Sequence, residues 1–77
     1  MEGITLFPNP TTEYISIKTD AKVEGLKIID LKGRVLKQTN AVEAGQRISV
    51  ENLPSGFYIA QVKTEVGEKA IRFVVKR

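Results

Sequence analysis

Residues that favour turns recur roughly every eight to twelve positions along this 77-residue chain, and they limit every regular element to a short segment. Within these segments the apolar residues alternate with polar ones. Such alternation is typical of strands that bury one face. We therefore expect an all-β fold and specifically a β-sandwich, with a small closed barrel as the structural alternative.

Seven short strands are expected in one domain that covers residues 1–77. They span residues 4–7, 13–19, 26–29, 34–39, 46–50, 57–64 and 70–76. The alternation directs one set of side chains inward: Ile15, Ile17, Ile48, Val50, Tyr58, Ala60, Val62, Ile71, Phe73 and Val75. The opposite faces carry a second set that should face solvent: Ser16, Lys18, Phe57, Ile59, Gln61, Lys63, Arg72, Val74 and Lys76. We expect both terminal strands at sheet edges, where Pro8 and basic residues discourage pairing with other chains.

Residues 22–32 also fit a helix, because apolar side chains recur there three positions apart. Gly25, Gly33 and the β-branched pair Ile28–Ile29 favour a strand instead. Asp30 and Gly33 then hold the first and fourth positions of a tight turn, so residues 26–39 are predicted to form a hairpin.

The segment from Leu53 to Tyr58 places Pro54 and Gly56 directly before an aromatic and β-branched run, which is typical of a turn that enters a strand. Its spacing is similar to the tyrosine corner of immunoglobulin-like sandwiches. We expect Tyr58 to pack beside Leu53 while its hydroxyl holds the preceding loop. An ordinary core tyrosine is the alternative.

The composition excludes several kinds of chemistry. The chain has no cysteine and no histidine, so it has no disulfide, no thiol and no imidazole base. Asp20, Asp30 and Glu43 do not follow the spacing of a metal loop. We expect no enzyme activity, cofactor or metal. Turn capping and solvation explain these carboxylates.

The net charge of +3 is mild, and acidic residues are interspersed among the basic ones. The basic residues near Phe73 could in principle contact nucleic acid, but Phe73 is expected in the core, so we expect no nucleic-acid partner. No apolar run approaches the roughly 18–20 residues of a membrane helix, and the N-terminus is unlike a secretory signal. We expect Met1 to be an added start residue, with native chain upstream.

Four motifs occur in order: a Pro-Asn-Pro corner, an Asp-Leu-Lys-Gly-Arg turn, a Gly-Phe-Tyr strand entrance and a basic C-terminal strand. Together they span nearly the whole chain, and their order and spacing are more specific than any one of them. The chain resembles the type A C-terminal sorting domain of cargo proteins exported by the type IX secretion system of Bacteroidetes. The corresponding residues are Pro8, Asn9, Pro10, Asp30, Gly33, Arg34, Gly56 and Tyr58.

The resemblance implies an immunoglobulin-like sandwich at the end of a larger cargo protein. It also implies passage through the periplasm to an outer-membrane translocon, and then a location at the cell surface or outside the cell. A sortase-like peptidase would usually remove the domain, and a lipopolysaccharide anchor would replace it.

The last strand and the free chain end are the expected recognition surface, which would use strand addition and charge contacts. The residues expected to contact the translocon are Lys69, Arg72, Val74, Lys76 and Arg77. One alternative function is a carbohydrate-binding or adhesive module, for which Tyr14 and Phe57 are the plausible aromatic contacts. A structural spacer is the other alternative.

Overall fold

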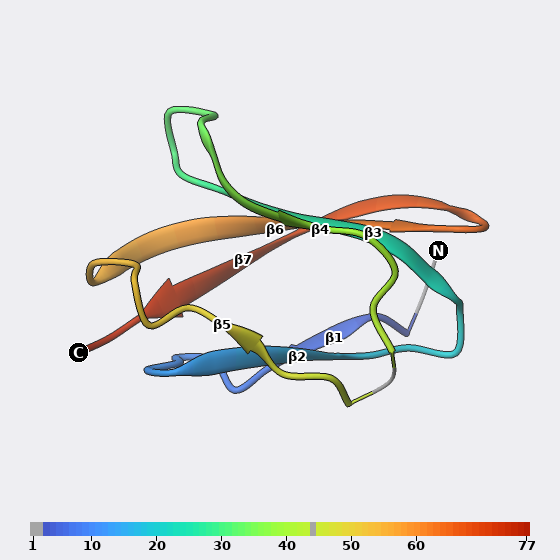
Figure 1. Cartoon of the computed structure of the whole chain (residues 1–77), viewed down its shortest axis with the longest axis horizontal. Coiled ribbons are helices and arrows are strands. Elements are labelled where there is room, and N and C mark those ends of the chain that lie inside the picture. The colour runs from blue at the N-terminus through green and yellow to red at the C-terminus, as the bar shows by residue number, and fades with distance from the viewer. Residues whose placement is uncertain (1–2, 44) are drawn as a thin grey trace.

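The computed structural model describes residues 3–43 and 45–77, and the expectation about Met1 lies outside them. All of the regular structure in these two ranges is β-strand (Figure 1). The strands are β1 (Thr5–Phe7), β2 (Tyr14–Lys18), β3 (Val23–Ile29), β4 (Val35–Thr39), β5 (Ile48–Ser49), β6 (Gly56–Thr64) and β7 (Gly67–Val75). The segment 22–32 thus contains a strand, and the helical alternative is wrong.

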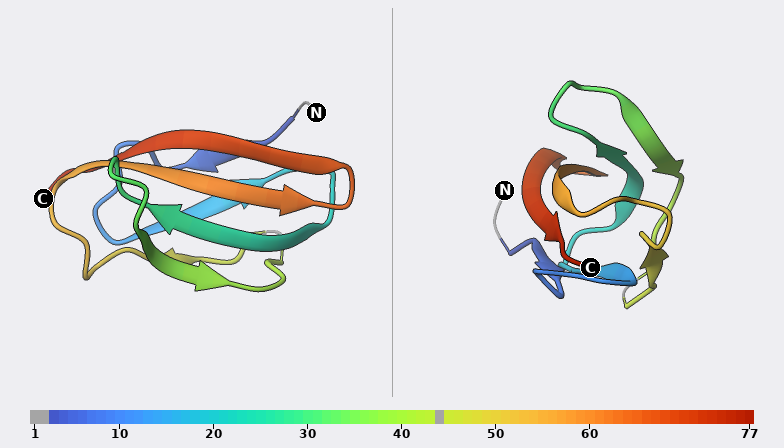
Figure 2. Two further views of the ribbon diagram at one scale, coloured as in Figure 1. Left: turned by 90° about the horizontal axis from the view of Figure 1, so that it is seen from above. Right: turned by 90° about the vertical axis from the view of Figure 1, so that its left-hand side faces the viewer.

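Two antiparallel sheets face each other. One has three strands in the order β1-β2-β5, and the other has four in the order β4-β3-β6-β7. Figure 2 shows the smaller sheet lying as a layer across the larger one. This is the expected immunoglobulin-like sandwich rather than a closed barrel, and both terminal strands lie at sheet edges as predicted.

The core lies between the two sheets, and the residues predicted to face inward supply most of it. Of the predicted set, Phe73, Ile15, Ala60 and Val62 are fully buried, and Ile28, which was not assigned to a face, is buried with them. Ile71 is half-buried and packs against this cluster. The alternation therefore assigned the inner faces of β2, β6 and β7 correctly, because each of these strands has one face against the opposite sheet.

Some details differ from the expectations. Ser16 is buried rather than exposed, because Phe7 of β1 lies directly opposite it on the outer face. β3 begins at Val23 rather than residue 26, and an irregularity in its pairing between Val23 and Gly25 hid this start in the sequence pattern. β7 likewise begins earlier than expected, at Gly67.

The stretch after β4 also contributes to the core. Val42 is buried and its N–H donates to the Val23 carbonyl at 3.2 Å. The following strand β5 keeps only two residues of the predicted 46–50, although Ile48 and Val50 both point inward as expected. A segment that lacks alternation can therefore still close the side of a sandwich.

Candidate functional site

The first three motifs and the end of the basic C-terminal strand lie at one end of the sandwich. Gly56 of β6 pairs with Val75 of β7, and Thr11 of the first corner forms a bridge to the same Val75. The Asp30 turn follows Ile29, which pairs with Ile59 near the start of β6. In Figure 1 these segments all lie toward the left, with the turn after β3 at the upper left and the C-terminus at the lower left. We call this the motif end.

The tyrosine corner is present. The Tyr58 hydroxyl donates to the Pro54 carbonyl at 2.6 Å, and the Tyr58 ring is buried against Phe73, with 5.8 Å between ring centroids. Leu53 packs partly buried against the same core. Packing fixes the Tyr58 ring in the core, and the hydrogen bond fixes Pro54 against the Tyr58 hydroxyl. The loop from Pro54 to Tyr58 is therefore held in place at its first and last residues. The predicted tyrosine corner is confirmed.

The Asp30 turn is closed by its own side chains. The Gly33 N–H donates to the Asp30 carbonyl at 3.0 Å, and Gly33 has φ of +87°, a conformation that favours glycine. The Asp30 carboxylate accepts from the N–H groups of Lys32 and Arg34 and from the Arg34 guanidinium at 2.7 Å. The backbone N–H of Arg34 is the largest cause that lowers the pKa of Asp30 below its ordinary value of 3.8.

The Pro-Asn-Pro corner covers the outer edge of β7. The Asn9 side chain accepts from the Val74 N–H at 3.0 Å and donates to the Arg72 carbonyl at 3.5 Å. Thr11 continues this contact through its backbone, with 2.8 Å bonds to the Val74 carbonyl and the Lys76 N–H. The Asn9 side chain and the Thr11 backbone thus take the place of a neighbouring strand. They bond to the edge of β7 from the Arg72 carbonyl to the Lys76 N–H.

Arg77 ties the chain end to two loops, the one between β1 and β2 and the one between β5 and β6. Its guanidinium donates to the carbonyls of Thr12 at 2.6 Å, Val50 at 2.5 Å and Leu53 at 2.7 Å. Its backbone N–H donates to the Ser55 hydroxyl at 3.1 Å. The expectation of a free chain end is therefore wrong. The basic terminal side chain closes the motif end, because loop carbonyls that converge there need a donor with several N–H groups.

The other residues predicted to contact the translocon lie in different places. Arg72 and Val74 are on the outer face of the larger sheet, and Arg72 is exposed whereas Val74 is half-buried. Lys76 follows β7, and its side chain is exposed at the motif end. Lys69 lies on the opposite half of β7, across from Val62. The structure therefore separates Lys69 from the other four residues.

The outer face of the larger sheet carries an apolar patch at the motif end. Phe57 pairs with Val74, and Ile59 pairs with Ile29, which in turn pairs with Val35. Phe57 is 55% exposed and Val35 is 53% exposed. We call these five residues the outer patch. Only the part of the outer patch on β6 was predictable, because residues 57–60 are apolar on both faces of the strand. Val35 and Ile29 join the patch only through strand pairing.

The two candidate sugar-contacting aromatics do not form a common platform. Tyr14 lies on β2 of the smaller sheet, where the Arg47 guanidinium stacks 4.3 Å from its ring centroid. Phe57 lies on β6 of the larger sheet, on the outer patch. Because a carbohydrate platform needs adjacent exposed rings, this arrangement does not favour the carbohydrate-binding alternative.

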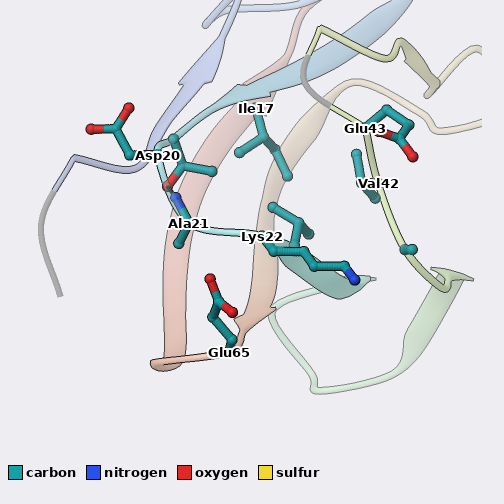
Figure 3. Close-up of a pocket in the computed structure, with 10 residues that line it drawn as sticks. Ile17, Asp20, Ala21, Lys22, Val42, Glu43 and Glu65 are labelled. Carbon is teal, nitrogen blue, oxygen red and sulfur yellow. Dashed lines mark hydrogen bonds between the residues drawn. The ribbon is translucent and has the colours of Figure 1, made fainter.

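A pocket of about 320 Å³ lies at the end opposite the motif end, between Ile17, Val42 and the turn at Glu65 (Figure 3). Asp20 and Glu43 also line it, and Figure 3 shows their carboxylates well apart. In the described part of the chain, no three acidic residues group as they would around a metal ion. Asp30 is at the motif end, so the three carboxylates considered in the sequence do not meet.

The described residues include no helix that is long and apolar enough to span a membrane. A comparison with curated proteins found no match. The model of the secretion system C-terminal sorting domain family matches residues 5–76, which include the first three motifs and the C-terminal strand as far as Lys76. This family is not an enzyme family, and it implies a domain fused to cargo, handled by the secretion machinery and exported to the cell surface or extracellular space. The chain belongs to the secretion system C-terminal sorting domain family, and it is a C-terminal sorting signal of the type IX secretion system.

Proposed function

We propose that this domain directs a larger cargo protein from the periplasm through the outer-membrane translocon. A sortase-like peptidase then removes the domain, and a lipopolysaccharide anchor replaces it. The domain itself performs no catalytic step. The family match supports the sorting role, and the gathering of three motifs and the end of the C-terminal strand at one end of the sandwich supports a single recognition surface there.

We further propose that the outer patch, with Arg72 and Lys76 beside it, contacts the translocon. Phe57 and Val74 are neighbours across two strands, and Arg72 lies opposite Ile59 on the same face. Exposed apolar side chains that are contiguous and bordered by charge are typical of protein-binding surfaces. Asn9, Tyr58 and Arg77 have a different role, because their polar groups are bound within the domain and hold the motif end in shape.

The position of β1 is compatible with this surface. Thr5 pairs with Lys18 at the far end of β2, whereas Thr11 lies at the motif end. A cargo protein that precedes β1 therefore enters the sandwich at the end opposite the motif end (Figure 1). The outer patch stays accessible while the cargo is attached.

The proposal is tested with a reporter protein fused upstream of the chain and exported in a host with this secretion system. The Phe57→Ser/Val74→Ser variant should leave the reporter in the periplasm. The Gln61→Ser/Lys63→Ser variant is the matched control, because it changes the same outer face away from the patch, and it should be exported. Thermal unfolding of each isolated domain shows whether the fold is retained.

A second variant, Arg72→Ser/Lys76→Ser, removes the charges beside the patch while it leaves the core intact. Surface substitutions of this kind usually change stability by less than about 0.5 kcal/mol. We expect reduced export with an almost unchanged melting temperature. Normal export of both the patch variant and the charge variant, in folded domains, contradicts the proposed recognition surface.

A further inference from the structure

Half of the outer edge of β7 is not covered. The pairing of β7 with β6 continues without a register shift from Gly67 to Val75. The N–H groups of Val74 and Lys76 both point away from β6, since they donate to Asn9 and Thr11. Because hydrogen-bonding direction alternates along an antiparallel strand, the backbone groups of Glu68, Ala70 and Arg72 point to the same outer edge.

Asn9 and Thr11 occupy only the later part of this edge. The Arg72 carbonyl receives the long bond from Asn9, and the bonds to Val74 and Lys76 follow it. Within residues 3–43 and 45–77, no hydrogen bond joins the edge-facing N–H and carbonyl groups of Glu68 and Ala70, or the N–H of Arg72, to another residue. This free edge can therefore accept another strand.

The other sheet edges are less suited to strand addition. β1 has three residues and runs into Pro8, and β5 has two residues. β4 pairs with β3 through an irregularity near Val35, which disturbs its edge. The free part of β7 is regular, and a strand needs a regular row of donors and acceptors to pair.

The charges along the free edge are self-complementary. If a second β7 pairs antiparallel with the first and Ala70 lies opposite its own copy, Glu68 lies opposite Arg72 of the second copy, and the reverse pair forms too. All three of these positions have backbone groups that point to the edge, so the Ala70 pair can exchange two hydrogen bonds. In each Glu68–Arg72 pair the free Arg72 N–H can donate to the Glu68 carbonyl, while the Arg72 carbonyl, which accepts the 3.5 Å bond from Asn9, has a second lone pair for the Glu68 N–H. Among the described residues the ion pair is the one between Asp30 and Arg34. Glu68 and Arg72 therefore form no ion pair with these residues in the monomer.

We propose that two copies of this domain associate through the free edges of β7 in this register. Gly67 of one copy then lies opposite Phe73 of the other, and the added strand ends before Val74, whose N–H already donates to Asn9. The small side chain of Ala70 at the two-fold axis allows close approach. The side chains of Glu68 and Arg72 lie on the same face of the joined sheet, where opposite charges attract across strands. The inference does not depend on the proposed recognition surface.

The test measures self-association of the chain by sedimentation equilibrium at low salt, up to about 1 mM, which reaches the weak affinities of small interfaces. Ala70→Pro removes an N–H that points to the edge and not to β6, and it should give a monomer at every concentration. Glu68→Arg and Arg72→Glu each place like charges opposite one another. Each should raise the dissociation constant about tenfold or more.

The charge exchange is the decisive variant. Glu68→Arg/Arg72→Glu restores opposite charges across the axis and should return the dissociation constant to near that of the original chain. Melting temperatures of the four variants show that each is folded. A chain that is monomeric at all concentrations overturns the proposal, and so does a dimer that the single charge changes do not weaken or that the exchange does not restore. If Ala70→Pro fails to fold, the charge variants still decide the outcome.

Discussion

Arg77 provides the sharpest test of whether the basic chain end holds the domain together. In Arg77→Ala the carbonyls of Thr12, Val50 and Leu53 all lose the guanidinium. The bonds to Thr12 and Leu53 are exposed, so water can replace the guanidinium there, whereas the bond to Val50 is partly buried. Hydrogen bonds to charged groups contribute roughly 1.5–3 kcal/mol each, but exposure and the entropy of ordering an arginine reduce this.

We therefore expect Arg77→Ala to lower the free energy of unfolding by about 1–2 kcal/mol. For a domain of this size each kcal/mol lowers the melting temperature by about 4–8 °C. The measurement is thermal unfolding followed by circular dichroism. Lys76→Ala is the matched control, because the Lys76 side chain is exposed and only its backbone is bonded to Thr11 and Thr12.

Arg77→Lys distinguishes charge from geometry. Lysine keeps the positive charge, but its ammonium group cannot present the planar fork that reaches three carbonyls, so it should recover only part of the lost stability. The reasoning is refuted if Arg77→Ala melts at the same temperature as the original chain. A reporter fusion carrying Arg77→Ala should still be exported at temperatures where the domain stays folded. Loss of export without loss of stability assigns Arg77 to direct contact with the translocon instead.

Three further variants test the other parts of the motif end. Tyr58→Phe removes the bond to the Pro54 carbonyl and should lower the free energy of unfolding by about 0.5–1.5 kcal/mol in chemical unfolding. Tyr14→Phe is the control and should cost almost nothing, because within residues 3–43 and 45–77 the Tyr14 hydroxyl forms no hydrogen bond. Gly33→Ala should cost about 1–2 kcal/mol in the same assay, since a Cβ there meets no atom within 4 Å and the cost comes from the positive φ alone. The pKa of Asp30 is lowered in the folded state, so the ionised carboxylate stabilises the fold at every pH above its unfolded-state pKa of 3.8. The original chain should therefore be more stable than Asp30→Asn by the full amount at neutral pH, and this difference should shrink as the pH falls below 3.8. An advantage that does not change with pH contradicts this assignment.

The sequence alone determined the strands and most of their faces, because alternation and turn chemistry are local properties. The Asp30–Gly33 turn follows from two residues three positions apart, and the Tyr58 bond spans four positions. Alternation also placed Phe73 in the core. It failed at Ser16, whose burial depends on a residue of another strand.

Only the tertiary structure decided what the chain end and the Pro-Asn-Pro corner do. The bonds of Asn9 to the β7 backbone and of Arg77 to Thr12 join residues more than 60 positions apart, and they form because closure of the sandwich brings β7 beside the first corner. No periodic pattern encodes such contacts. In the sequence, a basic residue at the end of a strand looks like an exposed charge. In the structure, three carbonyls from two loops converge on Arg77, so its side chain is bonded within the domain.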